Sequence, residues 1–245
     1  MTILGEVPLT WRHALRDGLL TVVVDGTLTM ASSEVLHEAI TGLLRQNAGR
    51  LLVDLSGMVV ADEDAVQVFA AMVAQALPYP EVPVVVCAPT VEVMRLLSAG
   101  VLDLRLVFGS VAAGRTAALA DVPTVAEDLL PVTGAARRSR DVVTEACLRW
   151  AEPDLIGPAT LVASELVTNA AMHAHTLMTM QVRLLPCHLR IAVFDGSDLP
   201  AVTRAAGPCG GGRGLHLVEA VSAAWGSTAL PGGKVVWAAL SRGSS

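Results

Sequence analysis

The chain has 245 residues, of which 53% are hydrophobic and only 3% aromatic, and its net charge is −6. This length suffices for one large domain or for two small domains, each with its own core. The acidic balance, without a basic block, argues against a nucleic-acid-binding surface. The N-terminus lacks the layout of a signal peptide, and no apolar run approaches the ~18 residues of a membrane span. We therefore expect a cytoplasmic protein without a membrane contact.

The cysteines are widely spaced and form no Cys-x-x-Cys pair. This spacing fits neither a zinc site nor a small disulfide framework. We expect reduced and partly buried thiols, and no metal bound by them. The four residues are Cys87, Cys147, Cys187 and Cys209.

Strand-like and helix-like segments alternate through the first half. A Ser-x-x-Glu-like pattern begins the first helix, and Gly100 is a plausible cap at the end of the third. Such alternation predicts an α/β domain with a mixed sheet covered by helices. The expected strands are 19–26, 50–57, 82–89 and 104–110, and the expected helices are 32–49, 62–77, 90–100 and 111–120.

A seam with two prolines and a glycine follows at 120–136, after which the pattern starts again. We place the domain boundary here, with a first domain at 1–120 and a second at 121–245. In the second half helices come first and consecutive strands follow, which predicts an α+β sandwich with an antiparallel element. The expected helices are 136–151, the segment that carries 164–175, and 215–225, and the expected strands are 177–186, 188–196 and 232–240.

The segment "SELVTNAAMHAH" places Glu165 and Asn169 four residues apart, so both point from one helix face. A carboxylate can accept a proton from an attacking hydroxyl. An amide oxygen is a hard ligand that suits Mg²⁺. Alone, the pair also fits an ordinary solvated helix face.

Two further segments contain residues that could contact a ligand: a carboxylate at a strand end and a run of glycines before a helix. "VFDGSDLP" places Asp195 at the end of an apolar strand, where a carboxylate can accept hydrogen bonds from an adenine amino group or simply form a turn. "GGGRGLHLV" places glycines directly before a helix, where backbone N–H groups can approach phosphate oxygens. The setting excludes a dinucleotide fingerprint, and the residues around Lys234 exclude a P-loop.

The ordered combination of these segments resembles the GHKL ATPase fold. "ELVTNAAMHA", "GGRGLHLVEAVSAAWG" and "GGKVVWAAL" resemble the anti-sigma-factor serine kinases of bacteria, over roughly residues 129–240. The resemblance implies ATP and Mg²⁺ as cofactors. Glu165 would be the general base and Asn169 the Mg²⁺ ligand. Asp195 would recognise adenine by accepting a hydrogen bond from its amino group.

The same resemblance implies further nucleotide-binding residues. The phosphate-side turn would be formed by Gly212, Arg213, Gly214 and Leu215. His173, Ser197 and Lys234 also occupy motif positions, and His173 fits a packing role equally well. His173 and His175 form a His-x-His, which we do not expect to bind a metal because no third ligand is evident.

The sequence departs from the family at two places. The second glycine of the adenine-side box is missing, and the segment reads Gly196, Ser197, Asp198, Leu199. Val235 stands where relatives commonly carry a threonine. Both departures concern the affinity for ATP.

The first half resembles a STAS domain, the fold of anti-anti-sigma factors, over about residues 18–120. "LLVDLSGMVVADEDAVQVFAAMVA" carries the resemblance. The family's phosphoacceptor serine is replaced here by Glu63, so this turn cannot take a phosphate at that position. Glu63 either imitates a phosphoserine, with part of its charge, or marks a site that has decayed into an acidic helix start.

The two resemblances together imply a kinase-type regulator. It would phosphorylate a serine of an anti-anti-sigma partner and also control a sigma factor, with a homodimer formed through the second domain. The alternative is a non-catalytic interaction module in which nucleotide shapes a binding surface or does not bind. The missing glycine and Val235 favour this alternative, whereas Glu165 and Asn169 favour the enzyme.

Overall fold

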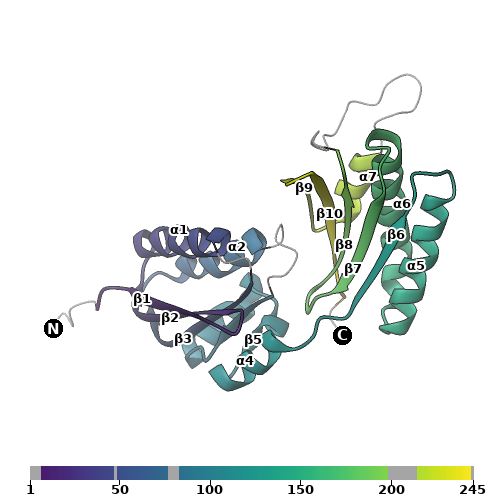
Figure 1. Cartoon of the computed structure of the whole chain (residues 1–245). Helices are drawn as coiled ribbons and strands as arrows, with labels where there is room; N and C mark the ends of the chain where they lie inside the picture. Colours follow the sequence, from purple (N-terminus) through teal and green to yellow (C-terminus); the bar gives the residue numbers. More distant parts are fainter. Residues whose placement is uncertain (1–6, 47–48, 77–82, 198–213, 244–245) are drawn as a thin grey trace, which may run out of the picture. The chain divides into compact units, whose positions relative to one another are not determined.

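The computed structural model describes residues 7–46, 49–76, 83–197 and 214–243 (Figure 1). The chain divides into two compact units, Met1–Asp121 and Val122–Ser245. The boundary expected from the sequence lies between residues 120 and 121. Each unit has its own sheet and its own core, and each is described by itself.

The first unit is built on a five-stranded mixed sheet in the order β1-β2-β3-β4-β5. β1 pairs antiparallel with β2, and the other neighbours are parallel. The central strands are rich in buried Val and Leu, as expected of a parallel sheet covered on both faces. The strands are β1 Thr10–Arg16, β2 Leu19–Leu28, β3 Arg50–Val60, β4 Val84–Cys87 and β5 Val107–Phe108.

Helices cover both faces of this sheet: α1 and α2 lie on one side and α4 on the other (Figure 1). Under α4 the core contains Leu19, Leu52, Val85, Cys87 and Ala118. The α-helices are α1 Met30–Gln46, α2 Gln67–Ala76, α3 Val91–Leu96 and α4 Val111–Leu119. Short helical turns are η1 Glu63–Val66, η2 Leu97–Val101 and η3 Leu104–Leu106.

Two details of the first unit differ from the sequence-based expectation. α1 begins at Met30 and not at the serine pair, because the backbone N–H of Ser32 donates to Thr29 Oγ1 and that of Thr29 donates to Ser32 Oγ. Thr29 therefore caps the helix. Strand β1 was not expected, because almost all of its residues are exposed and its pairing with β2 is its main stabilisation.

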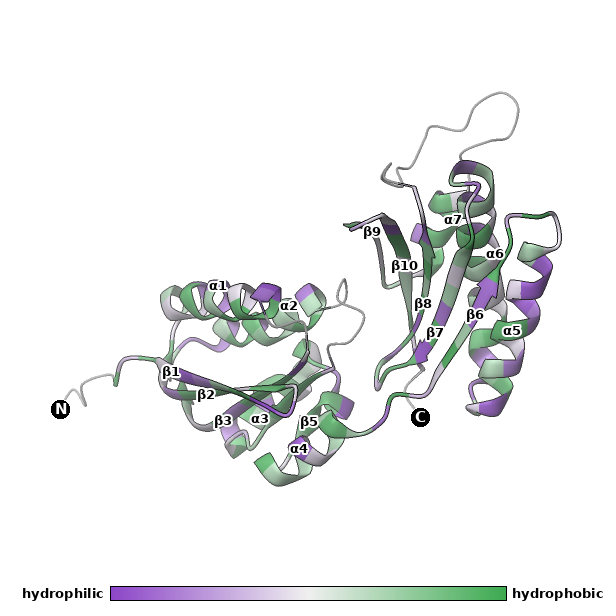
Figure 2. Cartoon of the chain, in the orientation of Figure 1, coloured by the Kyte–Doolittle hydropathy of each residue, from purple (hydrophilic) through white to green (hydrophobic). Residues whose placement is uncertain are grey.

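The second unit is built on a five-stranded sheet in the order β6-β7-β8-β10-β9, with every neighbouring pair antiparallel. Three helices pack on one face of it, and hydrophilic residues colour the outer side of α5 (Figure 2). The strands are β6 Thr124–Leu129, β7 Met178–Leu184, β8 His188–Asp195, β9 Ala224–Leu230 and β10 Gly233–Ser241. The helices are α5 Ala135–Arg149, η4 Pro153–Leu155, α6 Ile156–His173 and α7 Gly214–Val221.

The expectation of an antiparallel element over helices agrees with this unit, but two strands were missed. β6 lies inside the segment that we read as a seam. β9 begins at Ala224, within the segment that we assigned to a helix up to Trp225. Both are edge strands, which need only one paired neighbour and carry a weak apolar pattern.

One helical segment, Pro153–His173, is long and apolar enough to cross a membrane by length and composition. This finding differs from the expectation that no apolar run approaches the length of a membrane span, because the apolar residues of this segment are interrupted by polar ones. The core helix of a soluble protein passes the same test of length and composition. The buried residues of α6 belong to the core of the second unit and are Ala159, Val162, Ala163, Leu166, Val167 and Ala170.

Candidate functional site

The carboxyl end of β8 forms a corner with the start of β10 and the segment after α6. Lys234 lies directly opposite Asp195 in the antiparallel pairing of β10 with β8. The backbone N–H of Gly196 donates to Thr176 Oγ1 at 2.9 Å. These contacts bring together residues from three separate parts of the second unit.

Asp195 and Lys234 form a buried ion pair at this corner. Lys234 Nζ lies 2.9 Å from Asp195 Oδ1, and the side chains are 4% and 0% exposed. The backbone N–H of Ser197 donates to the same oxygen at 2.9 Å. Asp195 Oδ2 is buried and has no hydrogen-bond partner among the residues that the structure describes. A buried acceptor of this kind is ready to receive a donor from a ligand.

Both side chains point to the face of the sheet that the helices cover. Side chains alternate between the faces of a strand, and Val193 of β8 and Val236 of β10 belong to the core under the helices. Asp195 and Lys234 lie two residues from them and share their face. Val235 lies on the opposite face, so a hydroxyl-bearing side chain at this position would not point into this corner.

Gly233 makes the close approach of β10 to β8 possible. Its φ is 157°, and a Cβ at this position would lie 2.0 Å from the backbone oxygen of Asp195. Any side chain here would collide with backbone atoms. Neither Gly233 nor Thr176 was singled out as part of the site from the sequence. The Gly-Gly pair before Lys234 is the one signal that pointed to Gly233.

Glu165 lies against the N-terminus of α7. A Cβ at Gly214 would meet Glu165 Oε2 at 2.4 Å, which means that α7 begins directly beside this carboxylate. Glu165 and Gly214 are 49 positions apart in the sequence, and the packing of α6 against α7 brings their motifs together. The fold thus joins the Glu–Asn segment to the end of the glycine-rich turn.

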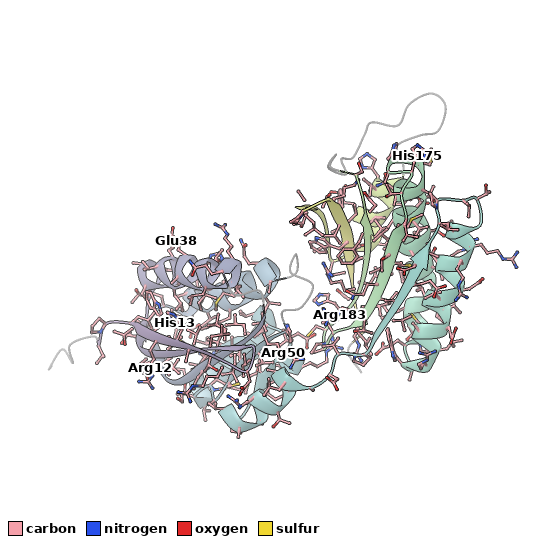
Figure 3. The ribbon with its side chains drawn as sticks, viewed as in Figure 1. Arg12, His13, Glu38, Arg50, His175 and Arg183 are labelled. Carbon is pink, nitrogen blue, oxygen red and sulfur yellow. The ribbon has the colours of Figure 1, made fainter. Side chains whose placement is uncertain are left out.

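Asn169 lies one turn after Glu165 on the same side of α6, and both residues are half-buried. His173 follows Asn169 by four residues, lies at the end of α6 and is exposed. His175 is exposed as well and has a φ of 53° in the turn beyond the helix (Figure 3). Within the described residues no three His, Cys, Asp or Glu side chains are grouped so that they could hold a metal ion.

The phosphate-side turn is described only in part. Gly212, Arg213, Asp198 and Leu199 lie outside the described residues. Gly214 begins α7, and the side chain of Leu215 is buried in the core of the second unit. The placement of Leu215 gives its side chain a packing role, so only its backbone could contribute to the turn.

In the first unit Glu63 begins the turn η1. Glu63 Oε1 lies 2.8 Å from Arg95 Nη2 of α3, in an exposed ion pair. The neighbouring Asp62 Oδ2 accepts a hydrogen bond from the backbone N–H of Met30 at 2.8 Å and so holds the start of α1. The acidic turn therefore ties together α1 and α3.

The described cysteines Cys87, Cys147 and Cys187 are buried, where the sequence predicts at least partial burial. Burial raises the pKa of Cys87 to about 11, with a further contribution from the negative charge of Asp54. Burial raises the pKa of Cys147 to about 11 as well, with a contribution from Glu152. Both thiols are neutral at physiological pH and poor nucleophiles. Cys209 lies outside the described residues.

Comparison with known proteins identifies the first unit. Residues 11–107 match the family model described as Mlab, STAS domain. The match covers less than half of the chain and lies within the first unit. The N-terminal unit is therefore a STAS domain. No curated protein gives a match.

Solved structures show weak similarity to the chain. An anti-sigma factor antagonist from Mycobacterium paratuberculosis is 21% identical, with 45% of this chain and 94% of that chain covered and a TM-score of 0.39. The unphosphorylated anti-sigma factor antagonist SpoIIAA is 11% identical, with coverages of 46% and 100% and a TM-score of 0.39. The RsbU and RsbW domains of a Mycobacterium tuberculosis protein are 21% identical, with coverages of 51% and 34% and a TM-score of 0.39.

Proposed function

We propose that the second unit is a GHKL-type ATP-binding domain and that the chain is a protein serine kinase of the anti-sigma-factor type. The observation that carries this proposal is the buried acceptor Asp195 Oδ2, at the end of β8 on the helix-covered face of the sheet. An adenine amino group would supply the donor that this oxygen does not receive from the described residues.

The N-terminus of α7 is the proposed binding place for phosphate groups. Its eight residues begin at Gly214, and the first N–H groups of a helix favour an anion. Asn169, on the neighbouring α6, would hold Mg²⁺ through its amide oxygen, with water and phosphate oxygens as the other ligands. Because the described residues offer no group of three metal ligands, the ion would be held mainly through the nucleotide.

Glu165 is the proposed general base. It is half-buried on α6 and lies against the first residue of α7. A serine hydroxyl next to the proposed phosphate-binding site would therefore be within its reach. Glu165 would accept the hydroxyl proton as the oxygen attacks the γ-phosphorus. Positioning and charge neutralisation supply most of the rate in phosphoryl transfer.

The STAS domain supports a role in partner switching. Its position Glu63 cannot take a phosphate, so the proposed substrate is a serine of a separate anti-anti-sigma protein. A sigma factor and a second copy of this chain are the other proposed partners, in the cytoplasm. Glu63 is already paired with Arg95, as the carboxylate of a fixed, phosphorylated-like turn would be.

Titration calorimetry of the full chain with Mg-ATP tests the first step of this proposal. We expect one binding event that Asp195→Ala removes and Glu165→Gln leaves nearly intact. Absence of binding at millimolar Mg-ATP would contradict the kinase and leave the alternative, an interaction module that needs no nucleotide.

A further inference from the structure

We propose that Lys234 determines which purine the second unit accepts. It does so by holding Asp195 so that a single buried oxygen, Oδ2, remains as acceptor for the base. This inference rests on the proposed nucleotide site and adds a residue that selects among nucleotides. The chain contains no other lysine, so every lysine-specific measurement reports on this residue alone.

The hydrogen bonds of the corner are divided unequally between the two carboxylate oxygens. Oδ1 accepts from Lys234 Nζ and from the backbone N–H of Ser197, both at 2.9 Å. Lys234 Nζ also lies 3.5 Å from the backbone oxygen of Ser197. Oδ2 receives no donor from the described residues. Since Oδ1 is held on two sides, the carboxylate cannot turn without breaking these bonds.

Charge compensation by Lys234 keeps the carboxylate an acceptor. A buried carboxylate without a cation is strongly disfavoured, whereas an ammonium at hydrogen-bond distance compensates the charge. An ionised carboxylate accepts hydrogen bonds and donates none. The site therefore suits the 6-amino group of adenine. It rejects the 6-carbonyl of hypoxanthine or guanine, because two acceptors would then face each other.

The corner is built so that this pair cannot easily be replaced. The pair lies across the β10–β8 register, and Gly233 leaves no room between the strands at this point. Lys234 is also shielded from the outer face of the sheet, since its side chain is 4% exposed and points toward the helices. An ammonium at the surface of a turn would not exert such control, because water would screen it.

The test measures the affinity of the full chain for Mg-ATP and Mg-ITP, which differ at the 6-position of the base. For the wild type we expect ATP to bind at least tenfold more tightly than ITP. Lys234→Met should reduce this ratio to about one, because Asp195 is no longer fixed as an acceptor. Lys234→Arg, which keeps the cation, should retain most of the preference.

Asp195→Asn is the matched control for hydrogen-bond direction. Its amide can present a donor, so it should bind ITP better than ATP while its oxygen still accepts from Lys234. If Lys234→Met fails to fold, the comparison of Lys234→Arg with the wild type and the lysine resonances of the wild type carry the test. A role limited to stability would lower both affinities equally and leave the ratio unchanged.

A spectroscopic measurement follows the same residue without a substitution. In protein labelled with ¹⁵N-lysine, Lys234 gives one ammonium and one backbone resonance, and we expect both to move more with Mg-ATP than with Mg-ITP. If ATP binds but the ratio survives in Lys234→Met, this inference is wrong and the proposed function stands. If the wild type binds neither nucleotide, both are wrong.

Discussion

Glu165 Oε2 lies so close to Gly214 that a Cβ at that glycine would come within 2.4 Å of it. The contact joins the middle of α6 to the first residue of α7. It therefore sets the distance between the proposed general base and the proposed phosphate-binding helix terminus. Any change at Gly214 should act on the position of this carboxylate first.

Gly214→Ala should reduce phosphotransfer by about tenfold or more while leaving the chain folded. The added methyl group displaces the end of a flexible side chain, which costs little stability, but misplaced catalytic groups cost much rate. Gly157→Ala is the control, since a Cβ there meets nothing within 4 Å and alanine favours the helix. Equal activity in both variants, measured by transfer of labelled phosphate, would exclude this role of the contact.

The variants Glu165→Gln and Asn169→Ala should distinguish the role of the general base from that of the Mg²⁺ ligand. Glu165→Gln should abolish phosphotransfer and leave Mg-ATP binding nearly unchanged, because the side chain keeps its shape and loses its basicity. Asn169→Ala should weaken ATP binding in the presence of Mg²⁺ and have little effect without it. Calorimetry with and without Mg²⁺ distinguishes the two, and an equal loss in both variants would indicate a structural role for this helix face.

Glu63→Ser should restore a phosphoacceptor to the STAS domain. The variant places a hydroxyl at the start of η1 and frees Arg95 from its present partner. With Mg-ATP we expect a mass gain of one phosphate at position 63, which disappears when Glu165→Gln is added. Loss of the exposed Glu63–Arg95 pair should change the free energy of unfolding by less than about 1 kcal/mol. An unmodified serine beside an otherwise active kinase would show that the turn is no longer a substrate.

Gly114→Ala should destabilise the STAS domain by about 1–3 kcal/mol, the usual cost of overpacking a core. A Cβ at Gly114 would lie 2.0 Å from Cys87 Sγ, and Cys87 is fully buried. Adding Cys87→Ala should recover part of the loss by giving the methyl group room. Urea unfolding of both variants measures this, with Gly42→Ala in an open part of α1 as control. Independent, additive effects would mean that the two residues do not share this space.

The buried thiols should resist alkylation until the chain unfolds. The pKa of Cys87 rises in the folded state from 9.0 to about 11, chiefly through burial, so the fold favours the neutral thiol. This contribution to stability is complete below pH 9 and is lost as the pH rises through about 11. At pH 8 iodoacetamide should leave Cys87 and Cys147 unmodified in the native chain and label both in urea. Rapid native labelling at either position, read by peptide mass analysis, would contradict this.

The sequence predicts the core strands and helices well because their apolar patterns arise from burial along a single element. The edge strands β1, β6 and β9 escaped prediction, since most of their residues are exposed or only partly buried and their apolar pattern is weak. The candidate site shows the same division. Glu165 and Asn169 share a face by helical spacing alone, whereas the pairing of Lys234 with Asp195 depends on the register between β10 and β8. No local pattern encodes that register.

Thermal unfolding of the full chain with and without Mg-ATP tests the central claim most directly. A ligand at about 100 times its dissociation constant adds about 2.7 kcal/mol of stability, which raises an unfolding midpoint by several degrees. We predict such a rise for the wild type and a much smaller one for Asp195→Ala. An unchanged midpoint of the wild type at millimolar Mg-ATP would contradict nucleotide binding, and with it the assignment of Glu165 as a catalytic base.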